Sequence, residues 1–551
     1  MHVLRRVPEP AIVWITSVAA SLAFLLTGPY SNFAPVGFLD PWYYTGYFLH
    51  FRYLVHTYGP TYYVSRLPWI LPGLTAFRIV SPEAASVILN LAIVSVSAVS
   101  LYWSVRWFYG PPAGATAAAL LVTNPYFIST VSWDYPDAPS IAYGFAALMC
   151  AVRPNGSRRV NSGLTGMFLA LSGLTHMTAG PMILAVLAIA LWHHRSSPRD
   201  LLQACVAISV GAAVVVLALC PVSQILIGRW TYFYWQIYFA ILTLRNPADL
   251  AHAWGVGPGF LLTAYRLFAP ALLLLVGPFL VRLRKDWELA SEAYLALAIC
   301  LGLYALQEFV LHAASLRVQY QSSFMVVPLF FLSGIITGQF VTSWLRAGII
   351  IVAVVALPIT FSMWAWPQHP WPILFFLGAI TVLLLFLEQL RFGMITLAGL
   401  LFLSPALDPA YAYAWDYPTP IRGPNRNAFH DLMTFDAAVQ SSTDGSRRLR
   451  FWFDRDEPAT PFYDSAESLY LWIPADFTRE LTTWSGAELQ KQVQPNTTFV
   501  NLTLHPERIA SRLSLLASRG VRVGNERRRT MQYQGATLYI ILEDVQSTHG
   551  G

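Results

Sequence analysis

Residues 38–73 read FLDPWYYTGYFLHFRYLVHTYGPTYYVSRLPWILPG and lie between the first and second long apolar runs of the chain. This segment contains one carboxylate, Asp40, two arginines, Arg52 and Arg66, and a dense set of tyrosines and tryptophans. A plain connection between membrane helices would be short and polar, whereas this one is long, aromatic and sparsely charged. Aromatic and basic side chains of this kind concentrate where a membrane meets water. We therefore expect the segment to lie along a membrane interface, beside a functional site.

The composition around this segment is that of a chain surrounded by lipid. Of the 551 residues, 56% are hydrophobic and only 12% are charged, whereas a soluble protein has about 25% charged residues. About thirteen apolar runs approach the roughly 20 residues that a membrane-spanning helix needs; one of them covers residues 112–131. The sequence therefore predicts a polytopic α-helical membrane protein with about 13 transmembrane helices.

The charges predict how these helices are oriented. Residues 1–420 contain 20 Lys and Arg against 14 Asp and Glu, whereas residues 421–551 contain 15 of each. If the N-terminus is cytoplasmic, alternate loops carry Arg106, Arg153, Arg158, Arg159, His193, His194, Arg195, Arg199, Arg282, Arg284, Lys285, Arg346 and Arg391. Loops rich in arginine and lysine stay on the cytoplasmic side. The aromatic first loop, residues 28–83, and everything beyond the last helix are then expected outside. The arginine-rich composition favours a bacterial inner membrane.

Residues 421–551 differ in character and predict a soluble extracytoplasmic α/β domain, after a transmembrane domain of residues 1–420. Charged residues become frequent there, and the apolar runs shorten. Strands are predicted at RLRFWFD (448–454), TTFVNLTL (497–504) and ATLYIILEDV (536–545), and helices at residues 427–440 and 506–518. Asn496 and Asn501 begin N-x-Thr sequons, which short sequences often contain by chance.

Acidic residues of the outer loops are the first candidates for chemistry. Asp40 lies in Leu-Asp-Pro-Trp, and Asp134 and Asp137 lie in Trp-Asp-Tyr-Pro-Asp-Ala-Pro. A carboxylate there could act as a general base on an acceptor hydroxyl or amine, and a second could orient the acceptor or hold a divalent cation. The alternative is structural: Asp137 precedes a predicted helix, and Asp-Pro is a turn signal.

Cationic groups on the same predicted face are the second set of candidates, namely Arg66, His176, Arg317 and Arg245. A phosphate at a membrane interface is well bound by fixed guanidinium donors. The alternative for each arginine is that its side chain reaches toward lipid headgroups. Glu308 and His312 are four residues apart on a predicted helix and could pair with each other.

Several common activities are excluded by missing motifs. The chain has no P-loop, no GxGxxG after a strand, no GxSxG elbow and no HExxH. Its four cysteines lie in apolar runs without ligand spacing. Charged residues deep in the apolar runs are scarce, although a proton-coupled carrier usually needs them.

The candidate residues lie in motifs that follow one another along the chain. Asp40 lies early in the first outer loop, and Arg66-Leu-Pro-Trp-Ile-Leu-Pro-Gly leads to the second apolar run. The third apolar run ends in Asn-Pro-Tyr-Phe, before the Trp-Asp-Tyr-Pro-Asp137-Ala-Pro motif. Arg317-Val-Gln-Tyr stands before a later, proline-containing run. In this arrangement the chain resembles the GT-C glycosyltransferase superfamily, in the branch of protein O-mannosyltransferases and lipid A aminoarabinose transferases.

The resemblance is best over residues 35–185, and it implies a reaction. Such enzymes take a sugar from a polyprenyl-phosphate carrier and invert the anomeric centre. The resemblance implies an extracytoplasmic acceptor, which could be a lipid, a glycan or a protein. It implies no nucleic-acid partner. By this resemblance Asp40 would be the general base, while Asp137, with Asp134, would position the acceptor or a divalent cation. The donor phosphate would be bound by Arg66, Arg317, His176 and Tyr320.

The sequence departs from the family pattern at two of these positions. Asp40 is followed by Pro41, where many members have another acid or a small residue. His176 stands where the family has a lysine, and a histidine binds phosphate well only when it is protonated. Two other hypotheses therefore stay open: a transporter or flippase of lipid-linked sugars, and a non-catalytic scaffold of the same fold.

Overall fold

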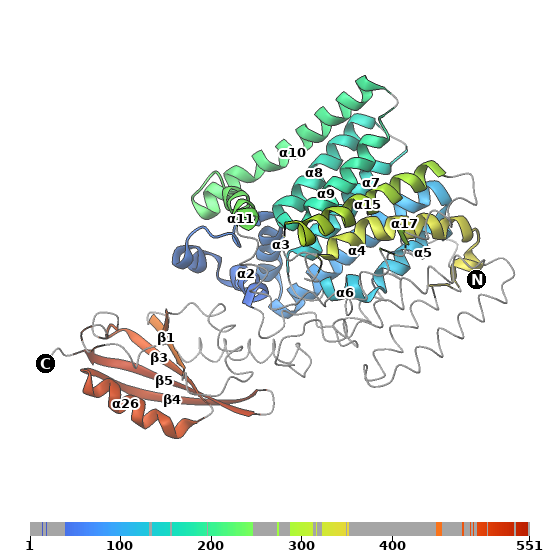
Figure 1. The fold of residues 1–551 in the computed structure, drawn as a ribbon. Helices are drawn as coiled ribbons and strands as arrows, with labels where there is room; N and C mark the ends of the chain where they lie inside the picture. Colours follow the sequence, from blue (N-terminus) through green and yellow to red (C-terminus); the bar gives the residue numbers. More distant parts are fainter. Residues whose placement is uncertain are drawn as a thin grey trace. The chain divides into compact units, whose positions relative to one another are not determined.

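The structure is a computed structural model, and it places the helices and strands of most of the chain (Figure 1). Apart from a few single residues, it describes residues 39–131, 135–154, 157–195, 197–245, 287–311, 322–348, 448–453, 476–478, 493–503, 505–533 and 536–548. The chain divides into two compact units. The first comprises Met1–Asn32, Pro60–Ala76 and Ala84–Asp416, and the second comprises Phe33–Gly59, Phe77–Glu83 and Tyr417–Gly551. The predicted division into domains of residues 1–420 and 421–551 stays a prediction.

Helices account for nearly all of the described chain before residue 351. They are α2 (Leu39–Tyr58), α3 (Leu67–Ile79), α4 (Pro82–Tyr109), α5 (Pro111–Val122), α6 (Pro125–Val131), α7 (Asp137–Val152), α8 (Arg158–Thr175), η2 (Met177–Ala179), α9 (Gly180–Trp192), α10 (Pro198–Ile227), α11 (Tyr234–Arg245), α15 (Trp287–Phe309), η4 (Ser323–Met325) and α17 (Val326–Phe340). The aromatic segment that was predicted as a loop thus contains two helices, α2 and α3.

Four of the described helices are long and apolar enough to cross a membrane: Pro82–Tyr109, Pro198–Ile227, Glu288–Phe309 and Ser323–Phe340. Shorter apolar helices occupy Pro111–Val122, Asp137–Val152 and Met177–Trp192. The helical character predicted from the sequence is confirmed, while the count of about 13 spans stays a prediction. The later apolar runs lie largely outside the described residues.

One predicted helix is wrong in its extent. Residues 112–131 form two helices, α5 and α6, which are separated by Thr123 and Asn124. Pro125 explains the break, because a proline disfavours helical geometry in the residue before it. The side-chain oxygen of Asn124 then accepts the backbone N–H of Phe127 at 3.2 Å, which starts α6.

The helices of the first unit pack in a defined order. α8 lies between α7 and α10, α9 contacts α7 and α15, and α17 contacts α5 and α15 (Figure 1). Every residue of α17 is buried. In contrast, α10 exposes a row of large apolar side chains, including Leu202, Val206, Val210 and Val214. An apolar face open to the surroundings is what a helix against lipid presents.

The predicted basic loops share one end of these helices. Arg153 and Arg158 lie where α7 ends and α8 begins, and His193 follows α9; all three line one cavity. Arg195 pairs with Glu288 at the start of α15, with 3.1 Å between Nη2 and Oε1. These four residues thus lie at one end of the described helices, while the predicted placing of all the basic loops on the cytoplasmic side stays a prediction.

The described part beyond residue 447 forms a five-stranded mixed sheet. Its strands are β1 (Arg448–Phe453), β2 (Asp476–Thr478), β3 (Thr497–Thr503), β4 (Val521–Tyr533) and β5 (Ala536–Thr548), in the order β2-β1-β3-β5-β4. β1 is parallel to β2 and β3, whereas β5 is antiparallel to β3 and β4. η6 (Pro506–Arg508) leads into α26 (Ile509–Ser518), whose Leu516 packs with Phe499, Val521 and Val545.

The three predicted strands of this sheet are confirmed, as is the predicted helix at residues 506–518, with Pro506 in its first turn. The predicted helix at residues 427–440 lies outside the described residues. Of the two sequons, Asn496 is exposed, whereas Asn501 lies buried within β3 and donates its amide to Glu543 at 3.0 Å. A glycan on Asn501 is therefore incompatible with the folded sheet.

Candidate functional site

The first unit brings together three of the seven predicted site residues. Arg66 precedes α3, Asp137 begins α7 and His176 follows α8, and all three side chains are buried. Asp40 is the second residue of α2, but its side chain lies outside the described residues, as do Asp134, Arg317 and Tyr320.

Arg66 is held where a turn meets a helix. The Ser65 hydroxyl donates to the Tyr62 carbonyl at 2.6 Å, and the N–H of Trp69 donates to the Arg66 carbonyl at 2.9 Å, which begins α3. The Arg66 side chain is only 1% exposed. Its guanidinium donates to the Tyr62 hydroxyl, and its central carbon lies 4.1 Å from the Tyr62 ring centroid and 5.7 Å from that of Tyr135. Cation–π contact with two rings stabilises a charge that is out of contact with water.

Asp137 occupies the first position of α7 and is fully buried. Its Oδ1 accepts the N–H of Ala138 at 2.9 Å. A carboxylate is stabilised at this end of a helix by the unpaired N–H groups of the first turn. The N-cap of α7 is Pro136 and makes no side-chain cap hydrogen bond, so the structural and the functional readings of Asp137 both stay open.

His176 lies in the turn between α8 and η2 and is 2% exposed. Its Nδ1 accepts the N–H of Thr178 at 3.3 Å and lies 2.5 Å from the Thr178 hydroxyl. Because Nδ1 is an acceptor, the neutral ring carries its proton on Nε2. Burial, and next the positive charge of Arg66, lower the pKa of His176 well below its ordinary value. The ring therefore acts as a neutral hydrogen-bond donor and not as a cation.

Aromatic rings connect these groups. The ring centroid of Tyr135 lies 5.8 Å from that of His176. The ring centroid of Phe324, which belongs to η4, lies 5.4 Å from that of His176. Since Tyr135 also faces Arg66, it bridges the guanidinium and the imidazole. We call Arg66, Tyr135, Asp137 and His176 the outer cluster.

Four long-range hydrogen bonds fix the backbone around the outer cluster. Gln236 of α11 donates from Nε2 to the carbonyl of Ser65 at 3.4 Å and to that of Leu174 at 2.7 Å. These carbonyls stand next to Arg66 and two residues before His176. The Tyr143 hydroxyl donates to the Pro68 carbonyl at 3.2 Å, and the Tyr304 hydroxyl donates to the Thr178 carbonyl at 2.9 Å.

Sequence reasoning missed the residues that hold the cluster together. Tyr62 and Tyr135 carry a weak signal, because Tyr62 stands four residues before Arg66 and Tyr135 lies inside the acidic motif. Gln236 and Phe324 carry none, since both stand in aromatic-rich stretches far along the chain. Within the described residues, no group of three His, Cys, Asp or Glu side chains could hold a metal ion.

The arrangement suits an anionic group. A guanidinium and a neutral imidazole both lie against the Tyr135 ring, and both are preorganised by buried neighbours. Fixed donors in a buried environment stabilise negative charge more strongly than donors in water do. The chemistry available here is recognition of a phosphate, next to a carboxylate held on a helix N-terminus.

Comparisons with known proteins give one match by family and several by structure. Residues 66–224 match the family of the dolichyl-phosphate-mannose-protein mannosyltransferases. A comparison with curated protein sequences finds no match.

Two similar solved structures are of bacterial origin. ArnT from Cupriavidus metallidurans in the apo state has a TM-score of 0.44 at 13% identity, over 96% of this chain and 97% of that chain. The arabinofuranosyltransferase AftD from Mycobacteria has a TM-score of 0.45 at 10% identity, over 98% of this chain and 40% of that chain. A third similar structure is that of the Archaeoglobus fulgidus oligosaccharyltransferase in complex with Zn and sulfate. It has a TM-score of 0.39 at 14% identity, over 96% of this chain and 72% of that chain.

The family match begins at Arg66 and includes Asp137 and His176, so it covers the whole outer cluster. Over these residues it confirms the resemblance that the motifs predicted: the chain is similar to the GT-C glycosyltransferases of the protein mannosyltransferase branch.

Proposed function

We propose that this protein is a membrane glycosyltransferase that moves a sugar, with inversion, from a polyprenyl-phosphate donor to an extracytoplasmic acceptor. The observation that carries this proposal is the buried outer cluster. It combines a guanidinium, an imidazole donor and a carboxylate at the meeting ends of α3, α7 and α8, within the residues that match the mannosyltransferase family.

The donor phosphate is bound by Arg66 and His176, with Arg317 and Tyr320 as further ligands. As the bond from the sugar to the phosphate breaks, negative charge grows on the phosphate. Arg66 and the Nε2–H of His176 stabilise that charge, and their buried neighbours keep them oriented during the reaction. The leaving phosphate is a weak base and needs little help from a general acid.

Asp40 takes the proton of the acceptor hydroxyl or amine, on the side of the sugar opposite the phosphate. Asp137, with Asp134, orients the acceptor or a divalent cation. The N-terminus of the chain is cytoplasmic in this proposal, so the reaction takes place on the outer face of a bacterial inner membrane. The loop of residues 28–83 and the domain of residues 421–551 lie on that face.

The direct test is sugar transfer by the full chain, purified and reconstituted in lipid, with a panel of polyprenyl-phosphate sugars. Asp40→Asn should abolish turnover of the donor without changing the melting profile. Arg66→Gln should lower kcat/KM for the donor by about 10–100-fold, because one charge-assisted contact is lost. Arg52→Gln is the matched control, since Arg52 belongs to the same segment but is exposed on α2.

The outcomes separate the competing hypotheses. Equal turnover by wild type and Asp40→Asn would transfer the role of base to Asp134 or Asp137. If no donor is consumed but labelled lipid-linked sugar crosses the bilayer, the protein is a transporter or flippase. Full activity of Arg66→Gln would remove the outer cluster from the donor site.

A further inference from the structure

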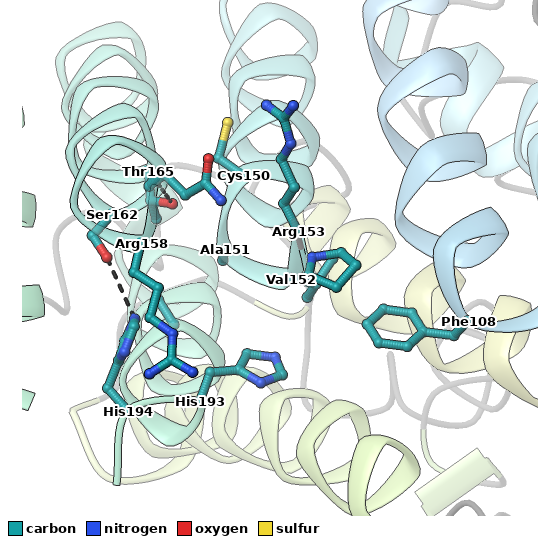
Figure 2. Close-up of a pocket in the computed structure, with 13 residues that line it drawn as sticks. Phe108, Cys150, Ala151, Val152, Arg153, Arg158, Ser162, Thr165, His193 and His194 are labelled. Carbon is teal, nitrogen blue, oxygen red and sulfur yellow. Dashed lines mark hydrogen bonds between the residues drawn. The ribbon is translucent and has the colours of Figure 1, made fainter. Parts of the chain in front are cut away.

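A second polar region lies at the other end of α8. This helix has 18 residues, so its first turn lies roughly 27 Å from His176. A cavity of about 180 Å³ opens there between the end of α7, the start of α8 and the end of α9, with Phe108 of α4 as one wall (Figure 2). Nothing in the proposed transfer reaction uses it.

Among the described residues, two arginines and no acidic residue line this cavity. Arg153 and Arg158 both line it; in Figure 2 the head of Arg158 lies beside His193, the head of Arg153 points the opposite way, and Ser162 lies beside His194. The remaining polar lining comes from Asn161 and Thr165, and the apolar lining includes Phe108, Val152 and Ala190. The wall thus combines positive charge and hydrogen-bond donors with an apolar side.

The acidic residues nearby pair with basic side chains, two of which line the cavity. Glu292 lies 3.0 Å from Nε2 of His193 and 3.8 Å from Arg195, and Glu288 pairs with Arg195. Asp200 lies 3.6 Å from Nη1 of Arg158, but both side chains are well exposed, and an exposed pair of this kind is weak. Arg153 makes no ion pair with any residue that the structure describes. Among the described residues, the charge of Arg153 is therefore not paired with an acid, and that of Arg158 is only weakly paired.

Asn161 provides an independent sign of a missing partner. It is only 8% exposed and lines the cavity, yet its side-chain amide makes no hydrogen bond to any described residue. Its backbone is fully engaged in α8, through Ser157 and Thr165. An amide that faces a cavity without a protein partner is free to bind a ligand or water there.

The helix itself adds to the attraction. Arg158, Asn161, Ser162 and Thr165 all come from the first two turns of α8, and Ser157, its N-cap, makes no side-chain cap hydrogen bond. The first N–H groups of a helix favour an anion.

We propose that this cavity binds an anionic phosphate ester, the group that acidic phospholipids carry. An arginine of the lining and the Asn161 amide would contact phosphate oxygens. The apolar wall, and the exposed apolar face of α10 that begins near Leu202, would contact the adjoining chain. Because the basic loops surround it, the site lies at the end of the bundle opposite the outer cluster. A soluble phosphate has the same head chemistry, and the experiment distinguishes the two sources.

The test uses the full chain, delipidated in detergent, and native mass spectrometry with dioleoylphosphatidylglycerol or dioleoylphosphatidylcholine. The Arg153→Gln/Arg158→Gln double variant should bind phosphatidylglycerol about tenfold more weakly than wild type. Arg159→Gln is the control, because Arg159 belongs to the same loop but contacts Gln203 and does not line the cavity. It should bind like wild type.

A second variant guards against unfolding. Asn161→Asp places a negative charge in the first turn of α8, where it is compatible with the helix, but it should repel phosphate. Its binding should fall while its melting temperature stays unchanged. The other arm of the test uses inorganic phosphate alone. A soluble ligand is indicated if phosphate raises the melting temperature of wild type and Arg159→Gln but not that of Asn161→Asp, while the phospholipids do not bind selectively. If neither probe distinguishes Asn161→Asp from Arg159→Gln, the proposal is wrong.

Discussion

At the residue scale, the protonation state of His176 decides how the outer cluster works. Sequence comparison placed a histidine where related enzymes have a lysine, which suggested a second positive charge beside the phosphate. In the structure, Thr178 donates to Nδ1, and Arg66 acts on the ring across Tyr135. The cluster therefore carries one cation, Arg66, and one neutral donor, His176.

This state predicts a pH dependence of stability. Because the pKa of His176 is lowered in the folded protein, the unfolded state binds a proton first as the pH falls through about 6.5. Stability contributed by His176 is thus present above that pH and is lost below it. We expect the melting temperature of the full chain in detergent to fall between about pH 7 and pH 5, and to fall less in His176→Gln. Identical pH profiles of the two proteins would contradict the neutral assignment.

At the element scale, the close contact between α8 and α10 depends on glycine. A Cβ on Gly211 would collide with the carbonyl of Gly163, and a Cβ on Gly166 would collide with the carbonyl of Ile208. The two helices therefore approach backbone to backbone, as small residues permit between helices in membranes. This contact fixes α8, which ends at His176 and begins at the second cavity.

We predict that Gly211→Val forces the helices apart and destabilises the protein by about 1–3 kcal/mol. Thermal unfolding of the full chain, with exchange of α8 amides as a local readout, measures the effect. Gly302→Ala in α15 is the control, since a Cβ there meets nothing within 4 Å; it should be neutral or slightly stabilising. Equal stability of Gly211→Val and wild type would show that the contact can relax.

The sheet contains a buried acid that gives a second test at this scale. Glu543 of β5 is 1% exposed and accepts the Asn501 amide. Burial, and next the charge of Glu526, raise the pKa of Glu543 to about 7. The folded sheet then holds a proton that the unfolded chain releases near about pH 4.5, so its stability falls as the pH rises from there to about 7. Hydrogen exchange of β3 and β5 amides in the full chain should show this fall, on the order of 2 kcal/mol, and Glu543→Gln should remove it.

At the scale of the whole molecule, local patterns predicted what local interactions decide. Asp137–Val152 was placed by its apolar run and acidic start, and β1, β3 and β5 by their alternation. β4 was missed because it carries Arg527, Arg528 and Arg529 in succession, charges that are usual on the edge strand that it forms. The link from Gln236 to Ser65 spans 171 residues. No periodicity encodes such a link, because only packing of the complete bundle brings the two turns together.

The separation of the two ends of α8 leads to the last prediction. The outer cluster and the second cavity share this helix but are roughly 27 Å apart, without common side chains. Substitutions at sites this distant usually act additively, within about 0.5 kcal/mol or roughly twofold in a rate or affinity. The triple variant Arg66→Gln/Arg153→Gln/Arg158→Gln should therefore show the donor kcat/KM of Arg66→Gln and the phosphatidylglycerol affinity of Arg153→Gln/Arg158→Gln.

If phosphatidylglycerol instead changes donor turnover in wild type but not in Arg153→Gln/Arg158→Gln, the two ends are coupled. Since the rigid contact at Gly211 joins α8 to α10 along this path, Gly211→Val should then weaken that coupling.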